Sequence, residues 1–149
     1  MKRAGSNFRL TASLVALAAI GVGLAVIAAG QTNGTTMPEA QRQEIETYAR
    51  QLVDSARTAQ TKFEAAKFLL TKDYPQAATD ALVGFLGDST NQAARIAVAR
   101  AVADTRQSKP EFVQPLFEML ADADAAVRAS AAEALTTYRN SGVLDRLTT

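Results

Sequence analysis

The chain has 149 residues and a mass of 15.8 kDa, enough for one domain but not for a second core. It contains no His, Cys or Trp, which excludes Ser-His-Asp and Cys-His nucleophilic sites, zinc fingers, iron–sulfur ligation and disulfide bonds. The net charge is +1, and the first thirty residues hold three basic residues and no acidic ones. The remainder is therefore slightly acidic, and we expect no nucleic-acid partner.

Residues 10–29 form an uncharged apolar run near the N-terminus. Twenty helical residues span about 30 Å, which is the hydrocarbon thickness of a bilayer. Lys2, Arg3 and Arg9 precede the run, and a polar stretch follows it. Because basic residues flank membrane helices on the cytoplasmic side, we expect a hydrophobic helix with its N-terminus in the cytoplasm and the rest of the chain outside.

Two fates of this segment stay open. A cleaved signal peptide has an apolar run of about 7–15 residues, so the longer run favours a retained signal-anchor in a single-pass protein of the cell membrane. Ala28, Ala29 and Gly30 would nevertheless serve as a small-residue cleavage site before Gln31. Cleavage there would give a secreted or periplasmic protein. Residues 1–30 are thus predicted to be the anchor or signal peptide, and residues 31–37 a polar linker.

After Thr36 the apolar residues follow helical spacing, and no stretch alternates like a strand. The predicted buried stripes are Ile45, Tyr48, Ala49, Leu52, Val53 and Ala56; Ala78, Ala81, Leu82, Phe85 and Leu86; Ala94, Ala97, Val98, Ala101 and Val102; Phe112, Val113, Leu116, Phe117 and Leu120; and Val127, Ala131, Ala134, Leu135 and Tyr138. This pattern predicts an all-α chain.

Helix-start signals recur at intervals of about 35 residues. Each combines a capping side chain with Glu or Gln three residues later and a Pro in the first turn. Such a combination is called a capping box, and the three candidates are Thr36 with Pro38 and Glu39, Asp73 with Pro75 and Gln76, and Ser108 with Pro110 and Glu111. Recurrence at a fixed interval indicates an internal repeat.

Alignment of the segments supports the repeat. Residues 82–88 match residues 116–122 at an offset of 34, and residues 94–102 match residues 127–135 at an offset of 33. A weaker first copy includes residues 52–54 and 62–69. Residues 143–147 resemble the start of a fourth copy.

Residues 122–135, DADAAVRASAAEAL, closely resemble the second-helix motif of HEAT repeats, and match best the short HEAT-like or phycobilisome-lyase-type variety. The resemblance is strong in the third copy, fair in the second and degenerate in the first. It implies a short α-solenoid of about three helical hairpins and a half repeat, at residues 38–72, 73–107, 108–140 and 141–149. Tetratricopeptide repeats require Trp, Gly, Tyr and Pro at offsets that this chain does not have.

The resemblance also implies a ladder of charged side chains that holds the repeats together. Each basic residue of the second helices would bind an aspartate of the loops between helices. The basic column is Lys62, Arg95 and Arg128, and the acidic column is Asp54, Asp88 and Asp122. We expect Arg128→Ala to lower the melting temperature more than Arg100→Ala does.

A third column, Lys67, Arg100 and Glu133, falls on the outer face of the second helices, where the family has its concave groove. With Glu64, these residues are the candidates for binding a partner, and Arg100 could pair with Glu133. The resemblance therefore implies a non-catalytic scaffold for protein–protein interaction.

We expect no catalytic residue, cofactor site or metal site. Asp122 and Asp124 are the nearest approach to paired carboxylates, but a loop between solvated helices offers no enclosed pocket. Ser108 and Lys109 fit a helix cap better than a nucleophilic pair. Without Cys or His, the chain also lacks the residues that a lyase-type chromophore site would use.

Two alternatives stay open. Val143, Leu144 and Leu147 would leave an apolar end on the solenoid. That end suits an accessory or self-assembling subunit that forms a homo-oligomer through residues 141–149. It also suits the N-terminal part of a longer protein whose activity lies beyond residue 149.

Overall fold

The computed structural model describes residues 37–74 and 76–138 of the chain. The described residues form helices and contain no strand, which confirms the all-α prediction for this part. The elements are α2 (Glu39–Val53), α3 (Ala59–Thr71), α4 (Gln76–Gly87), α5 (Gln92–Thr105), η1 (Pro110–Phe112), α6 (Val113–Met119), α7 (Ala125–Leu135) and η2 (Thr136–Tyr138). The predicted hydrophobic helix at residues 10–29 lies outside the described residues. None of the described helices is long and apolar enough to span a membrane.

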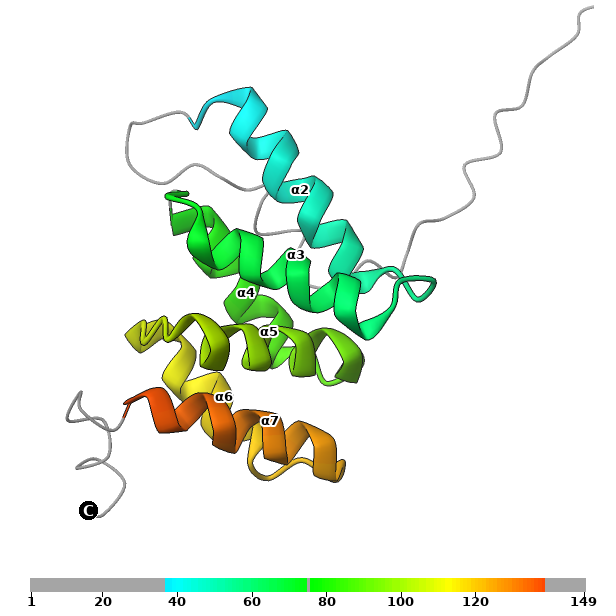
Figure 1. Ribbon diagram of the computed structural model, residues 1–149, viewed down its shortest axis with the longest axis vertical. Helices are drawn as coiled ribbons and strands as arrows, with labels where there is room; N and C mark the ends of the chain where they lie inside the picture. The colour runs from blue at the N-terminus through cyan, green and yellow to red at the C-terminus, as the bar shows by residue number, and fades with distance from the viewer. Residues whose placement is uncertain (1–36, 75, 139–149) are drawn as a thin grey trace, which may run out of the picture.

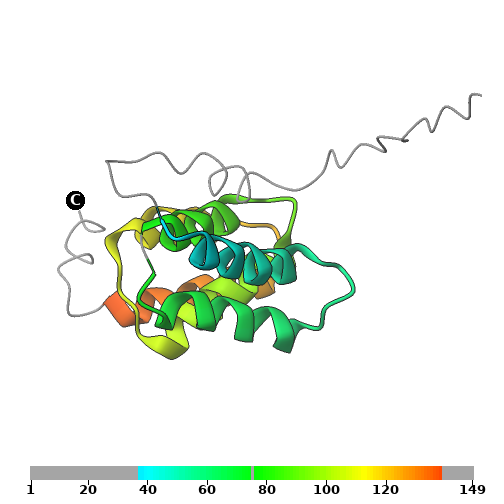
Figure 2. The ribbon, with the colours of Figure 1, turned by 90° about the horizontal axis from the view of Figure 1, so that it is seen from above.

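The helices form three antiparallel hairpins that stack one on the next, α2 with α3, α4 with α5, and α6 with α7. The second helices α3, α5 and α7 lie side by side from top to bottom in Figure 1 and make the most extensive contacts between hairpins. Seen from above, α4 and α6 lie on the opposite side of the molecule (Figure 2). This arrangement is a helical-repeat solenoid, in which each unit buries its apolar face against its neighbours.

Most residues of the predicted stripes are buried, Tyr48, Val53, Val113 and Phe117 are partly buried against the core, and two residues are exposed. All predicted core residues of α4, α5 and α7 are buried. Ala56 is exposed because α2 already ends at Val53, and Leu120 is 38% exposed because α6 ends at Met119, which is buried instead. Small side chains dominate α5 and allow close approach of the helices on either side. Those buried in α5 are Ala94, Ala97, Val98, Ala99, Ala101 and Val102.

The predicted capping box at Ser108 is wrong. The residue before η1 is Lys109, its side chain makes no capping hydrogen bond, and Pro110 opens the 3-10 turn that leads into α6. Likewise, Pro38 precedes α2 without a side-chain cap. Proline presets φ and lacks an N–H, so it can start a helix without an accepting side chain. Thr36 and Pro75, which belong to the other two boxes, lie outside the described residues.

The side-chain caps are found instead on the second helices. Thr58 accepts a hydrogen bond from the Thr61 amide before α3, and Asn91 accepts one from the Ala94 amide before α5. Asp124 accepts from two amides at the start of α7. These three caps stand 33 residues apart, so each repeat starts its second helix in the same way.

Asp124→Ala should destabilise the fold by about 1 kcal/mol, because it removes the acceptor for two amides at the start of α7. Ser108→Ala is the control and should change stability by less than about 0.5 kcal/mol. Urea unfolding followed by circular dichroism measures both. Equal losses would contradict the assignment of the caps.

Candidate interaction surface

The aspartate column shapes the loop between the two helices of each repeat. Oδ1 of each aspartate accepts a hydrogen bond from the amide two residues later, an arrangement that forms a tight turn. The bonds are Ala56 N to Asp54 at 2.9 Å, Thr90 N to Asp88 at 3.0 Å, and Asp124 N to Asp122 at 2.8 Å. The column therefore has a structural role in every repeat.

The basic column binds backbone carbonyls at or just beyond the end of the preceding helix. Lys62 Nζ donates to the Leu52 carbonyl, and Arg95 Nε donates to the Leu86 carbonyl at 3.0 Å. Arg128 Nη1 donates to the Asp122 and Ala123 carbonyls, each at 2.8 Å. Helix C-termini leave carbonyls without partners within the helix, and these side chains satisfy carbonyls in that region. Burial lowers the pKa of Lys62, and the nearby Asp54 partly offsets this shift.

One ion pair links the basic and acidic columns among the described residues. Arg95 of α5 pairs with Asp122 in the loop before α7, so the contact joins the second repeat to the third. Both side chains are largely buried, 6% and 16% exposed. The expectation of one such bond in every repeat is not met, because within the described part Lys62 and Arg128 bind carbonyls instead.

The Asp122 carboxylate should make the free energy of unfolding depend on pH in the acid range. Its hydrogen bond from the Asp124 amide, followed by that from Arg95, holds its pKa below the ordinary 3.8. A carboxyl group with a lowered pKa in the folded state stabilises the fold above its unfolded pKa, and that contribution disappears as the pH falls through its folded pKa. The wild type should thus have a higher free energy of unfolding than Asp122→Asn. This difference should be constant near neutral pH and should decrease below about pH 4. Unfolding measured from pH 7 to pH 2 tests this, and a difference that stayed constant throughout would contradict it.

The outer face of the second helices carries three of the predicted binding residues. Lys67 Nζ on α3 pairs with Asp104 on α5 at 2.8 Å, and this pair raises the pKa of Lys67. Arg100 is exposed on α5. Glu133 is exposed on α7, and no ion pair joins it to Arg100 in the described part of the chain. The ion pair between Lys67 and Asp104 therefore joins α3 to α5 across this face.

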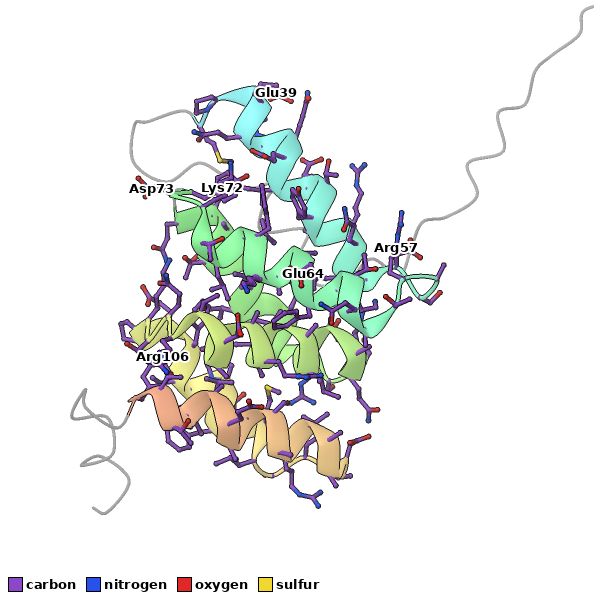
Figure 3. The ribbon with its side chains drawn as sticks, viewed as in Figure 1. Glu39, Arg57, Glu64, Lys72, Asp73 and Arg106 are labelled. Carbon is purple, nitrogen blue, oxygen red and sulfur yellow. The ribbon has the colours of Figure 1, made fainter. Side chains whose placement is uncertain are left out.

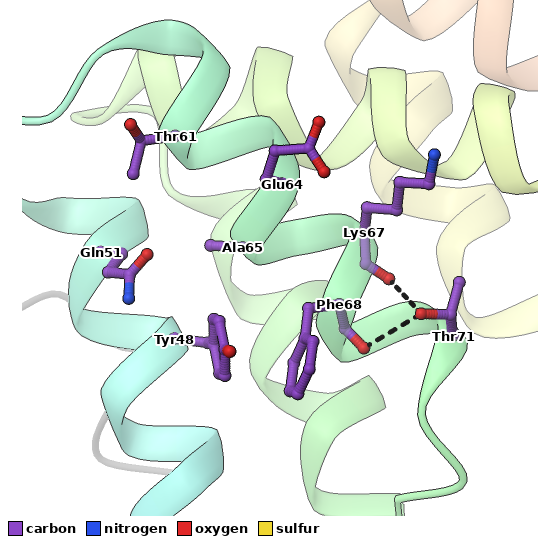
Figure 4. Close-up of a pocket in the computed structure, with 8 residues that line it drawn as sticks. All are labelled: Tyr48, Gln51, Thr61, Glu64, Ala65, Lys67, Phe68 and Thr71. Atoms are coloured by element: carbon purple, nitrogen blue, oxygen red, sulfur yellow. Dashed lines mark hydrogen bonds between the residues drawn. The ribbon is translucent and has the colours of Figure 1, made fainter.

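Glu64 lies about one helical turn before Lys67 on α3 and lines a hollow of about 360 Å³ between α2 and α3. Figure 4 shows Tyr48 and Phe68 facing each other there, and their rings stack with centroids 3.9 Å apart. Thr61, Lys67 and Thr71 also contribute to the lining. Sequence analysis did not predict the aromatic stack.

A second hollow of about 430 Å³ lies between α5 and α7. Its lining includes Glu133, Thr136 and Arg106, which Figure 3 labels near the end of α5. Arg106 ends α5 in a left-handed conformation, with φ of 52°. Glu64 and Glu133 thus occupy separate hollows at the two ends of the second-helix face.

The two carboxylates nearest to a pair in the sequence, Asp122 and Asp124, both have structural roles. Asp122 forms a turn and an ion pair, and Asp124 caps α7. Residues 37–74 and 76–138 contain no group of three acidic, His or Cys side chains that could hold a metal ion. What the arrangement offers is a solvated surface of mixed charge.

Comparison with known protein families shows to which family this chain is related. HEAT repeats match residues 45–136, more than half of the chain. The chain belongs to the HEAT-repeat family. HEAT repeats are commonly scaffolds for protein–protein interaction and are generally non-catalytic. Comparisons with curated proteins and with solved structures gave no match.

Proposed function

We propose that this HEAT-repeat protein is a non-catalytic scaffold that binds a partner protein with the outer face of α3, α5 and α7. The observation that carries this proposal is the side-by-side packing of the three second helices, which presents one continuous face to solvent. Lys67, Asp104, Arg100 and Glu133 place both signs of charge on it. Such a face suits a partner with complementary polar groups.

We further propose that the chain is exported and that residues 10–29 anchor it in the membrane with the solenoid outside the cytoplasm. The apolar length of this run and the basic residues before it support this. Release after Gly30 is the alternative. The N-terminus of the mature protein distinguishes them: Met1 indicates an anchored chain, and Gln31 indicates a released one.

The binding proposal is tested by cross-linked pull-down of the tagged full-length chain from its native cells. Lys67→Glu combined with Arg100→Glu should reduce recovery of a stoichiometric partner at least about tenfold. The reason is that the two reversed charges would repel a partner surface that is complementary to the wild type. Circular dichroism checks that the variant is folded.

A matched control reverses two arginines on α2. Arg42 and Arg50 form exposed ion pairs with Glu39 and Glu46, and exposed pairs contribute only about 0–1 kcal/mol. Arg42→Glu combined with Arg50→Glu should leave recovery unchanged. A partner lost equally from both double variants, or from neither, would contradict the proposed face.

A further inference from the structure

The α3 wall of the hollow between α2 and α3 differs from the equivalent positions of the other two repeats. Glu64 and Phe68 line the hollow, and Glu64 is exposed while Phe68 is partly buried. The second helices of the other repeats have small, buried side chains at the positions 33 and 66 residues later, namely Ala97 and Ala101 on α5 and Ser130 and Ala134 on α7. The first repeat therefore exposes a carboxylate and part of an aromatic ring where the other repeats have core residues.

The α2 wall of the hollow shows a matching change. Gln51 lines the hollow and is only partly buried. Phe85 on α4 and Met119 on α6 stand at the positions 34 and 68 residues later, and both are almost completely buried. Two polar side chains, Gln51 and Glu64, thus stand at core positions on opposite walls of one hollow.

A polar cap at the end of the solenoid does not explain these two residues. Terminal repeats need polar side chains on their outer face, whereas Gln51 and Glu64 line a hollow between the two helices of one repeat. They share that hollow with the stacked rings of Tyr48 and Phe68. The hollow thus combines polar groups with an aromatic wall, as small ligand sites do.

Glu64 gives the hollow a negative charge. Its carboxylate accepts a hydrogen bond from Gln60 at 2.7 Å, and no ion pair with it occurs in the described part of the chain. Lys67 also lines the hollow, but its amine pairs with Asp104 of α5 at 2.8 Å. Figure 4 shows the Lys67 side chain extending away from Tyr48. A cationic group in the hollow would therefore find a carboxylate, while the charge of Lys67 is already compensated.

An arginine side chain suits these groups better than a lysine. A guanidinium carries its donors in a planar fork, which can bind the Glu64 carboxylate and the Gln51 amide oxygen, whereas an ammonium is a compact point charge. The flat guanidinium and the apolar stem of arginine also pack well on aromatic rings such as those of Tyr48 and Phe68. The hollow of about 360 Å³ is near the lower limit of ligand pockets, about 300 Å³, so it suits one side chain.

We infer that this hollow binds an arginine side chain of the partner protein, with Glu64 as its counter-ion. The inference rests on the proposed function, because Lys67 belongs both to the second-helix face and to the lining of the hollow. It adds the chemistry of the partner. That protein presents an arginine beside the groups that complement Lys67 and Arg100.

NMR titration of the isotope-labelled full-length chain in a mild detergent tests the inference, with acetyl-arginine methylamide as the probe. Saturable shift changes should appear at the backbone amides of Gln51 and Glu64. The citrulline analogue, which has the same length but no charge, should cause none. Glu64→Gln should weaken binding of the arginine probe at least about fivefold, because it removes the charge and keeps the shape.

Glu118→Gln on α6 is the matched control. Glu118 is exposed and accepts a hydrogen bond from Gln114, four residues earlier, just as Glu64 accepts one from Gln60. This variant should bind the probe as the wild type does. No shifts in the wild type, equal shifts with the citrulline analogue, or equal affinities of the two variants would overturn the inference.

Pull-down from native cells separates a failure of this inference from a failure of the proposed function. Glu64→Gln should reduce recovery of the partner about fivefold, and Glu118→Gln should not. If Lys67→Glu with Arg100→Glu loses the partner while Glu64→Gln retains it fully, the inference is overturned and the proposed function stands. If the charge reversals also leave recovery unchanged, the proposed face is wrong, and the probe titration alone decides whether the hollow binds arginine.

Discussion

Replacing Arg95 by Met should lower the free energy of unfolding by about 3 kcal/mol. The substitution retains much of the apolar stem but removes the donors that bind the Leu86 carbonyl and the Asp122 carboxylate. Both acceptors would then lose a partner within the contact between the second and third repeats. In a domain of this size, the melting temperature should fall by roughly 15 °C.

The control for this prediction is Arg100→Met on the same helix. Arg100 is exposed, so its loss should cost less than about 0.5 kcal/mol. Arg128→Met should fall between the two, because Arg128 binds two carbonyls but is exposed. Thermal unfolding followed by circular dichroism gives the order. Equal effects at positions 95 and 100 would show that the ion pair does not hold the repeats together.

A double-mutant cycle isolates the ion pair itself. Asp122→Asn should cost clearly less in the Arg95→Met background than in the wild type, because the charge partner is already gone. Fully additive losses would show that Arg95 acts only through the Leu86 carbonyl.

Ala99→Leu should destabilise the fold by about 2 kcal/mol through overpacking. Ala99 is fully buried one turn after Arg95, on the side of α5 that faces the third repeat. A leucine there would push α5 and α7 apart along one of the two most extensive helix contacts in the stack. Helix propensity is not the cause, since Leu is nearly as good a helix former as Ala.

Ala93→Leu is the matched control, because Ala93 is exposed on the same helix. It should change stability by less than about 0.5 kcal/mol. The measurement is the midpoint of urea unfolding at an unchanged slope. A neutral Ala99→Leu variant would contradict close packing of the second helices.

The sequence predicted the helices and their buried faces well because apolar spacing directly reports which face is covered. Val98 and Val102 are buried as their spacing indicated. The helix-start signals were less informative. The pattern at Ser108 has the right residues for a capping box, but Pro110 starts a 3-10 turn without it.

The true caps were also present in the sequence. Thr58, Asn91 and Asp124 recur at 33-residue intervals, the same interval as the basic column. Comparison of polar positions across the repeats would have found them. Alignment of columns could not give the partner of Arg95, because it does not reveal whether an aspartate of the same repeat or the next one lies nearby. That choice depends on how the repeats stack, which brings Asp122 to Arg95.

The central claim is that the second-helix face binds the partner, and site-specific photo-cross-linking tests it most directly. A photoreactive amino acid replaces Arg100 on α5 in one variant and Gln114 on α6 in another; both positions are exposed. In native cells, position 100 should give a stoichiometric cross-link to a foreign protein and position 114 should give none. Cross-linking from position 114 but not from position 100 would contradict the claim and place the binding surface on the first helices.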